Sequence, residues 1–310
     1  MASRLLILGW HNVEGTWCFP SAPERGSKGL YEQFRMLQRS GNVVDLGDAL
    51  TKLANGQSLP PRAVALTFDD GYRDNLSLAF PMLHELGLPA TIFLAPGILS
   101  GQVQPWWEVL GRAFATSRRA SFRWGGVTAP LGDARRSAYD DVCGQLKHLD
   151  APAREAAVTE LVAELEPETR PDVSELFMDW DEARELVRHG VTVGSHSLDH
   201  AILANETPAS QRENLAESRR QLEEQLEVPV DLFAYPNGSP SDFDDATVGA
   251  AKDAGYRCGV TTIGGWNSRA TPLYELRRYV LFPERGRSGF RPIVKRSVLS
   301  LVPSGAGGGG

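Results

Sequence analysis

Short runs of apolar residues recur along the chain and alternate with segments of helical periodicity. The apolar runs, which we expect to form strands, cover residues 5–8, 63–68, 90–94, 191–194, 232–235 and 258–262. Amphipathic stretches that predict helices lie near 75–86, 181–189, 207–226 and 244–254. Strand–helix–strand repetition indicates a parallel sheet, and apolar runs without alternation are typical of strands covered on both faces. The pattern therefore predicts an α/β fold.

The stretch from about 100 to 175 breaks this rhythm. It opens with Trp106 and Trp107 and continues through residues 151–171, which are rich in Ala, Glu and Arg. We predict a mostly helical insertion that packs on the main body. Residues 1–303 then form a single domain. The Gly-rich tail 304–310 cannot contribute to a core and is predicted to be disordered.

Two carboxylates, Asp69 and Asp70, come directly after the strand predicted at 63–68. In a closed α/β barrel the active site lies at this carboxyl end of the strands. Adjacent carboxylates are costly unless a positive charge such as a divalent metal neutralises them. One carboxylate could then bind the metal while its neighbour acts as a base on metal-bound water. The alternative is a turn in which these residues only cap the next helix.

Two histidines, His196 and His200, follow the strand predicted at 191–194. A spacing of four lets both rings face one way if the segment turns helical, and neutral imidazoles suit zinc and similar metals. The chain has only six histidines, so composition alone does not explain this spacing. Two histidines and one aspartate leave metal positions open for water and substrate, as in catalytic sites. The alternative is a pair of surface or outer-shell histidines.

A tight turn ends the strand predicted at 232–235. It consists of Tyr235, Pro236, Asn237 and Gly238. Such a turn can point the backbone N–H of Asn237 into the site as an oxyanion donor, and Tyr235 could line the pocket. Trp107 and Trp266 are candidate pocket walls, although tryptophans are more often part of a core.

Composition narrows the class of protein. Of the 310 residues, 42% are hydrophobic and 23% are charged, as in ordinary soluble globular proteins. A net charge of −7 gives no support for nucleic-acid binding. Three scattered cysteines without a CxxC pair argue against a disulfide framework and a thiolate zinc site. The run at 5–8 is too short for a secretory signal and no run reaches the length of a membrane span, so we expect a cytoplasmic protein.

The motifs Thr-Phe-Asp-Asp-Gly at 67–71, His-Ser-x-x-His at 196–200 and Phe-Ala-Tyr-Pro-x-Gly at 233–238 occur in this order. Together they resemble the polysaccharide deacetylases of carbohydrate esterase family four. Residues 9–12 and 180–182 also look like this family, and the resemblance covers most of residues 1–285 outside the insertion. It implies a distorted (β/α)7 barrel that acts on an N-acetylated sugar, oligosaccharide or polysaccharide.

The resemblance also implies a division of roles. Asp69 would be the general base, and Asp70, His196 and His200 would hold the metal, usually zinc. The metal would polarise the acetamide carbonyl and lower the pKa of its water, and together with the Asn237 amide it would stabilise the oxyanion.

The chain departs from the family at two positions. Many members carry an arginine, which orients the base, where Ala234 stands, and many carry a late histidine that acts as the acid; no histidine follows His200. His11, at the end of the first predicted strand, is our candidate for the acid, with a purely structural role as the alternative. Arg277 or Arg278 could supply the missing positive charge near the base, and we also count Arg278 among the substrate-pocket residues.

Three functions fit these residues. The first is a metal-dependent hydrolase that removes an N-acetyl group from a glycan or amino-sugar conjugate. The second is a related C–N amide hydrolase, such as a deformylase or a ring-opening amidase. The third is a non-catalytic carbohydrate-binding relative, against which the retention of Asp69 beside the complete ligand set argues.

Overall fold

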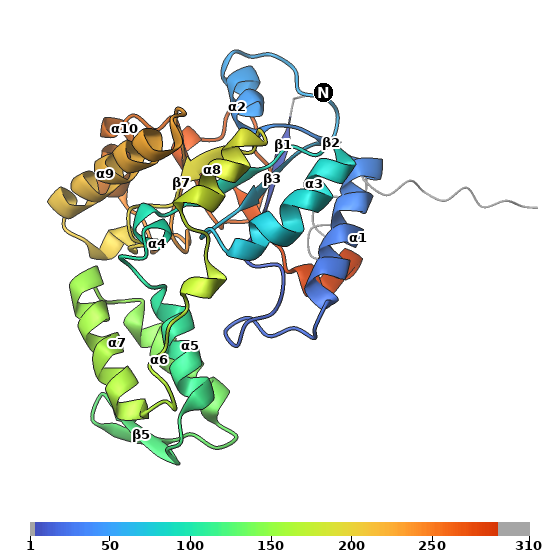
Figure 1. Ribbon diagram of the computed structural model, residues 1–310. Helices are drawn as coiled ribbons and strands as arrows, with labels where there is room; N and C mark the ends of the chain where they lie inside the picture. The colour runs from blue at the N-terminus through green and yellow to red at the C-terminus, as the bar shows by residue number, and fades with distance from the viewer. Residues whose placement is uncertain (1–3, 291–310) are drawn as a thin grey trace, which may run out of the picture.

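The computed structural model describes residues 4–290 (Figure 1). The predicted tail at 304–310, and the end of the predicted domain at 291–303, lie outside these described residues. Within them, the apolar runs form the strands of a parallel α/β barrel, as the alternation along the chain predicts.

The barrel strands of the described chain follow the order β10-β1-β3-β4-β7-β8-β9, and β2 pairs with β3 beside this path. Their bounds are β1 (Leu5–Trp10), β2 (Asn42–Val43), β3 (Ala63–Phe68), β4 (Thr91–Leu94), β7 (Thr192–Ser195), β8 (Leu232–Ala234), β9 (Cys258–Val260) and β10 (Arg278–Val280). A parallel bridge between Val260 and Leu276 brings the segment before β10 against β9. The seven strands of this path therefore form a nearly closed barrel.

Helices follow most of the strands and cover the outside of the barrel (Figure 1). The α-helices of this layer are α1 (Arg25–Ser40), α2 (Leu46–Ala54), α3 (Phe80–Leu86), α4 (Pro96–Leu99), α8 (Trp180–Arg188), α9 (Pro208–Leu226) and α10 (Asp245–Asp253). A π-helical turn η1 (Asn75–Ala79) precedes α3. The 3-10 segments are η2 (Ser174–Leu176), η3 (Leu203–Asn205), η4 (Leu273–Glu275) and η5 (Pro283–Phe290). No helix of residues 4–290 is long and apolar enough to cross a membrane.

The strands bury both faces, because alternate residues contribute to two different apolar clusters. One face packs against the helices, with side chains that include Leu6, Leu8, Val64 and Leu66. The other face fills the barrel, with Leu5, Ile7, Ala63 and Ala65 among its members. Apolar residues of α2 join this inner cluster next to the first residues of β1 and β3. The amino end of the barrel is thus closed, and the carboxyl end is left for polar side chains.

The insertion has its own apolar cluster and lies to one side of the barrel (Figure 1). It consists of α5 (Trp106–Thr116), β5 (Ser121–Trp124), β6 (Val127–Pro130), α6 (Arg135–Leu146) and α7 (Ala151–Leu165). Helices dominate, as the composition predicts, but the antiparallel hairpin β5–β6 was not predicted. Its turn is Gly125-Gly126, both with positive φ, which is a recognised signal for a two-residue hairpin.

Gly29 in α1 generates a prediction about packing, because a Cβ there would overlap the backbone carbonyl of Pro283 in η5. We expect Gly29→Ala to lower the free energy of unfolding by about 1–3 kcal/mol, the usual cost of overpacking. Gly144→Ala in α6 is the matched control, since a Cβ there meets no atom within 4 Å. That variant should gain up to about 1 kcal/mol from helix propensity. Urea unfolding measures both, and equal effects would contradict the close approach of α1 to η5.

Candidate active site

The side chains singled out in the sequence gather at the carboxyl ends of neighbouring strands. Asp69 and Asp70 directly follow β3, and His196 directly follows β7. The turn that begins at Tyr235 directly follows β8. Because these strands are parallel, their carboxyl ends share one rim of the barrel.

Asp70, His196 and His200 form a buried cluster whose ligand atoms all lie within 4.8 Å of one another. Asp70 Oδ1 is 3.3 Å from Nε2 of each histidine, yet this oxygen accepts no hydrogen bond. Ligands bound tetrahedrally at about 2.0–2.1 Å from a zinc ion would be about 3.3–3.4 Å apart. An unpartnered, buried carboxylate oxygen between two imidazoles therefore fits a divalent cation.

Contacts outside the cluster orient the first histidine. His196 Nδ1 lies 2.8 Å from the carbonyl oxygen of Ala234, which leaves Nε2 directed at Asp70. Such an outer contact fixes the tautomer and ring orientation of metal-binding histidines. Burial disfavours the imidazolium of His196, but Asp69 and Asp70 outweigh it and raise the pKa of the ring. Burial lowers the pKa of His200, which favours the neutral form that metals bind.

The backbone around the cluster is held in an uncommon conformation. Asp70 (φ 71), Ser197 (φ 63), His200 (φ 57) and Asn237 (φ 58) are non-glycine residues in the left-handed region. Each costs of order 1–3 kcal/mol, and such residues concentrate where side chains must be presented in a fixed direction. Their grouping here supports a functional site at this rim.

Asp69 is oriented by Arg278 rather than by a residue at position 234. Nη1 and Nη2 of Arg278 donate to the two carboxylate oxygens of Asp69, each at 2.6 Å, and both side chains are buried. Burial by itself raises the pKa of Asp69, but the guanidinium and His196 together lower it below its usual value. Asp69 is therefore held as a carboxylate. Arg278 is 0% exposed and contacts Asp69, the candidate base, so it does not line an open substrate pocket as predicted.

His11 lies beside the same carboxylate, with Nε2 3.9 Å from Asp69 Oδ2. Its side chain is 30% exposed, whereas that of Asp69 is 2% exposed. His11 therefore lies between the buried Asp69 carboxylate and solvent.

The insertion reaches the candidate metal cluster through Trp107, whose ring centroid is 4.5 Å from that of His200. Trp107 Nε1 donates to the Tyr72 hydroxyl at 2.9 Å, and this hydroxyl donates to Glu108 Oε1 at 3.0 Å. Thr16 Oγ1 donates to the same oxygen at 2.8 Å. Burial raises the pKa of Glu108 despite these hydrogen bonds. Tyr72 and Glu108 were not predicted, although an acid directly after two tryptophans in a helix was a usable signal.

Two predicted pocket residues lie elsewhere. The ring of Tyr235 is 0% exposed and packs in the core, and its hydroxyl donates to the carbonyl oxygen of Tyr274. Trp266 packs against the outer core cluster, and its neighbour Asn267 pairs with Leu5 at the amino end of β1. The chain returns to the amino end of the barrel because the parallel strand β10 must start there, so Trp266 lies away from the rim. The buried ring of Tyr235 does not line the rim either.

The remaining turn residues keep their predicted place. Pro236 is buried, and Gly238 has a φ of 69 in a position where a Cβ would crowd Thr262 N at 3.0 Å. The carbonyl of Asn237 accepts from Thr262 Oγ1 at 2.8 Å, which anchors the turn to the end of β9. The turn starts one residue after Ala234, the contact of His196.

Comparison with known proteins identifies the family. The family model for polysaccharide deacetylase matches residues 56–116 and 130–259, which is more than half of the chain. The chain belongs to the polysaccharide deacetylase family. The matched segments contain Asp69, Asp70, His196 and His200, whereas His11 and Arg278 lie outside them.

The similarity to two curated proteins covers only part of their length. YxkH of Bacillus subtilis is 24% identical over 243 residues, which are 78% of this chain and 60% of that protein. The poly-β-1,6-N-acetyl-D-glucosamine N-deacetylase of Escherichia coli is 34% identical over 86 residues, 27% of this chain and 13% of that protein. The chain thus spans less than two-thirds of the length of either relative.

A solved structure gives the same fold. The Streptococcus pyogenes deacetylase PplD in complex with acetate superposes with a TM-score of 0.62 at 18% identity, over 94% of this chain and 97% of that chain. At this identity the likeness concerns the fold, and it agrees with the barrel predicted from the motifs.

The cluster predicts a metal affinity that depends on His200. We expect the protein to bind about one zinc ion, and His200→Ala to weaken binding by at least about a hundredfold because one of three ligands is lost. Titration against a competing chelator measures this. His148→Ala, at an exposed histidine of the insertion, is the control and should bind zinc as the parent does. Undiminished binding by His200→Ala would remove His200 from the ligand set.

The buried pair predicts a strong energetic coupling between Asp69 and Arg278. Arg278→Gln should lower the free energy of unfolding by about 3–5 kcal/mol, because the Asp69 carboxylate is left buried without its partner. In the double variant with Asp69→Asn, much of this loss should be recovered, since no uncompensated charge remains. Urea unfolding of both single variants and the double variant gives the coupling energy. Arg277→Gln, at an exposed neighbour, should change stability by less than about 0.5 kcal/mol. Additive effects of the two substitutions would contradict the pairing.

Proposed function

We propose that the protein is a metal-dependent hydrolase that removes the N-acetyl group from an amino-sugar glycan. One observation carries the proposal. Asp69, held by Arg278 at 2.6 Å, directly precedes the metal-ligand candidate Asp70 and lies 3.9 Å from the partly exposed His11. A base, a cation site and a proton donor are what hydrolysis of an amide requires.

Asp70, His196 and His200 would hold the cation, and two imidazoles with one carboxylate favour zinc. A divalent cation bound there supplies Lewis acidity toward the acyl carbonyl and a lower pKa for water. With three protein ligands, positions remain for water and substrate.

Asp69 would accept a proton from the attacking water. Its carboxylate is kept ionised and in one orientation by the two hydrogen bonds from Arg278. The same bonds leave the carboxylate little freedom to rotate, which keeps a base in a fixed position.

His11 would donate a proton to the departing amine. Its position beside Asp69 and its partial exposure support this role, because the leaving group must reach solvent. The backbone N–H of Asn237, in the turn anchored to Thr262, is our candidate for stabilising the developing oxyanion.

Acetate release tests this division of roles. With zinc present, the protein should release acetate from oligomers of β-linked N-acetylglucosamine, a substrate choice that the 34% identity to the Escherichia coli enzyme over 86 aligned residues supports. Asp69→Asn should lower kcat by about 10²- to 10⁴-fold, the usual contribution of a general base, while zinc binding persists. Undiminished activity of Asp69→Asn would contradict the mechanism.

The nature of the leaving group separates His11 from Asp69. His11→Asn should lower kcat by about 10²- to 10⁴-fold on the amide, but much less on an aryl acetate, whose leaving group departs without a proton. Asp69→Asn should impair both reactions. His148→Asn is the control, because this exposed histidine is in the insertion. Equal losses of His11→Asn on both substrates would contradict its role as the acid.

A further inference from the structure

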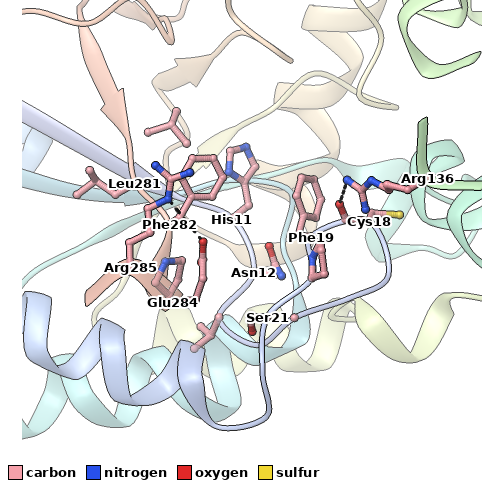
Figure 2. A pocket seen from close by; sticks show the side chains of 15 residues that line it. His11, Asn12, Cys18, Phe19, Ser21, Arg136, Leu281, Phe282, Glu284 and Arg285 are labelled. Carbon is pink, nitrogen blue, oxygen red and sulfur yellow. Dashed lines mark hydrogen bonds and ion pairs between the residues drawn. The ribbon is translucent and has the colours of Figure 1, made fainter. Parts of the chain in front are cut away.

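His11 lies on a segment that has just left the sheet. Trp10, the last residue of β1, accepts a hydrogen bond from the N–H of Asp69 at 3.0 Å. The next residue, His11, lines a cavity between the segments 11–21 and 280–285 (Figure 2). The ring of His11 is 30% exposed, and the nearly parallel ring of Phe19 lies 6.4 Å away, centroid to centroid. Because open space borders the imidazole, its position depends on the backbone that carries it.

That backbone is held by two side chains of the loop after β3. Asp74 Oδ2 accepts hydrogen bonds from the N–H groups of Val13 and Glu14 at 2.8 and 2.9 Å. Asn75 Nδ2 donates to the carbonyl oxygen of His11 at 2.7 Å. The same nitrogen also donates to Asp74 Oδ1 at 3.3 Å, which joins the two side chains. One pair of neighbouring residues therefore binds three backbone groups of the segment after β1.

The side chain of Asp74 is not used by its own helical segment. Asp74 directly precedes the π-helical turn η1, a place where an aspartate commonly accepts from the N–H groups of the following helix. It makes no such cap bond and instead reaches the segment after β1. Burial raises the pKa of Asp74 to about 6, although the hydrogen bonds from Glu14, Val13 and Asn75 favour the carboxylate. At neutral pH the fold therefore holds a buried negative charge at a cost that helix capping does not explain.

The same loop carries the candidate base, Asp69, directly after β3. Its Oδ2 is 3.9 Å from Nε2 of His11. Any shift of the segment after β1 against the loop changes this separation, and a misplacement of about 1 Å costs about a hundredfold in rate. The hydrogen bonds of Asp74 and Asn75 therefore fix the proposed acid relative to the base.

We propose that Asp74 and Asn75 are positioning residues, which hold the backbone of residues 11–14 so that the His11 imidazole stays beside Asp69. The inference rests on the proposed function, in which His11 protonates the departing amine. Among the hydrogen bonds of residues 4–290, those of the two side chains to this segment all go to backbone groups, so both residues act on His11 through its backbone. Residue 74 needs only an acceptor oxygen for this task, which an asparagine also supplies.

The leaving group separates positioning from general stability. Asp74→Ala should lower kcat on the amide by about 10- to 100-fold, but change kcat on an aryl acetate, which departs without a proton, by less than about threefold. Asp74→Asn keeps an oxygen for both N–H groups and loses only the 3.3 Å contact with Asn75. It should therefore stay within about threefold of the parent on both substrates. Added to His11→Asn, Asp74→Ala should cause no further loss on the amide, because the acid that it positions is absent.

Asp45→Ala is the matched control. The Asp45 carboxylate caps α2, where it accepts from the N–H of Asp48 and from Thr192 Oγ1, each at 2.9 Å. Thr192 is the first residue of β7, so this carboxylate lies at the amino end of the barrel, away from the rim. Its removal should destabilise the protein but leave the ratio of amide to aryl-acetate activity unchanged.

A measurement without turnover distinguishes failure of the positioning role from failure of the proposed function. NMR of the histidine side chains reports the surroundings of the His11 ring, whose signal is identified with His11→Asn. We expect this signal to shift in Asp74→Ala and to stay unchanged in Asp74→Asn and Asp45→Ala. If it shifts while the parent protein releases no acetate, the positioning of His11 is confirmed and the proposed function fails.

Two results overturn the inference and leave the proposed function standing. One is an unchanged His11 signal in Asp74→Ala, and the other is an equal loss of that variant on the amide and the aryl acetate. Asn75→Ala removes the bond to the His11 carbonyl and carries the same expectations. It replaces Asp74→Ala if that variant does not fold.

Discussion

The ion pair between Asp69 and Arg278 allows the inner face of the barrel to end in a buried carboxylate. Alternate residues of the β3 segment pass from Ala63 and Ala65, in the inner apolar cluster, to Thr67 and then Asp69. A carboxylate at that depth is costly without a partner, and removing either member of such a pair leaves an uncompensated charge. Arg278 donates to both oxygens, and two of its other N–H groups donate to Thr67 Oγ1 and to the carbonyl oxygen of Thr261.

Space for the guanidinium is created on the neighbouring strand. Gly9 of β1 stands where a Cβ would lie 3.0 Å from Arg278 Cδ and 3.2 Å from Thr67 Oγ1. A larger residue would push Arg278 away from Asp69. The glycine, the arginine and the aspartate, which come from three adjacent strands, therefore act as one unit.

Adjacent carboxylates in one turn thus have different surroundings, which suit the different roles proposed for them. Asp69 faces the guanidinium of Arg278, which is always charged. The backbone of Asp70 has a positive φ, and its carboxylate oxygen lies beside two imidazoles, which can be neutral. The histidines, in contrast to an arginine, leave a place for a metal between themselves and the carboxylate. Two identical side chains acquire separate roles through their environments alone.

The sequence was sufficient for the parts of this site that local patterns encode. Strands with every position buried, such as β1 and β3, are largely apolar runs, and the two aspartates follow β3 directly. β10 has three residues and begins with an arginine, so no run marks it. That Arg278 faces inward follows only from its pairing with Ile7 of β1, which is a tertiary contact. Trp266 was misplaced for a similar reason, since local sequence does not show that the chain returns to the amino end of the barrel before β10.

The insertion contributes to the site at two separate points, which explains why it packs against this rim. Its helix α5 sets Trp107 against His200, and Glu108 connects Tyr72 with Thr16. Its helix α6 supplies Arg136, which fixes the backbone in front of Phe19. Thr16 and Phe19 are themselves joined by hydrogen bonds, so α5 and α6 both hold the segment after β1 in place. The barrel therefore supplies the candidate base and the candidate metal ligands, while the insertion positions the segment after β1. Changes in the insertion can alter the segment after β1 without displacing Asp69, because the partner of that carboxylate, Arg278, comes from the barrel itself.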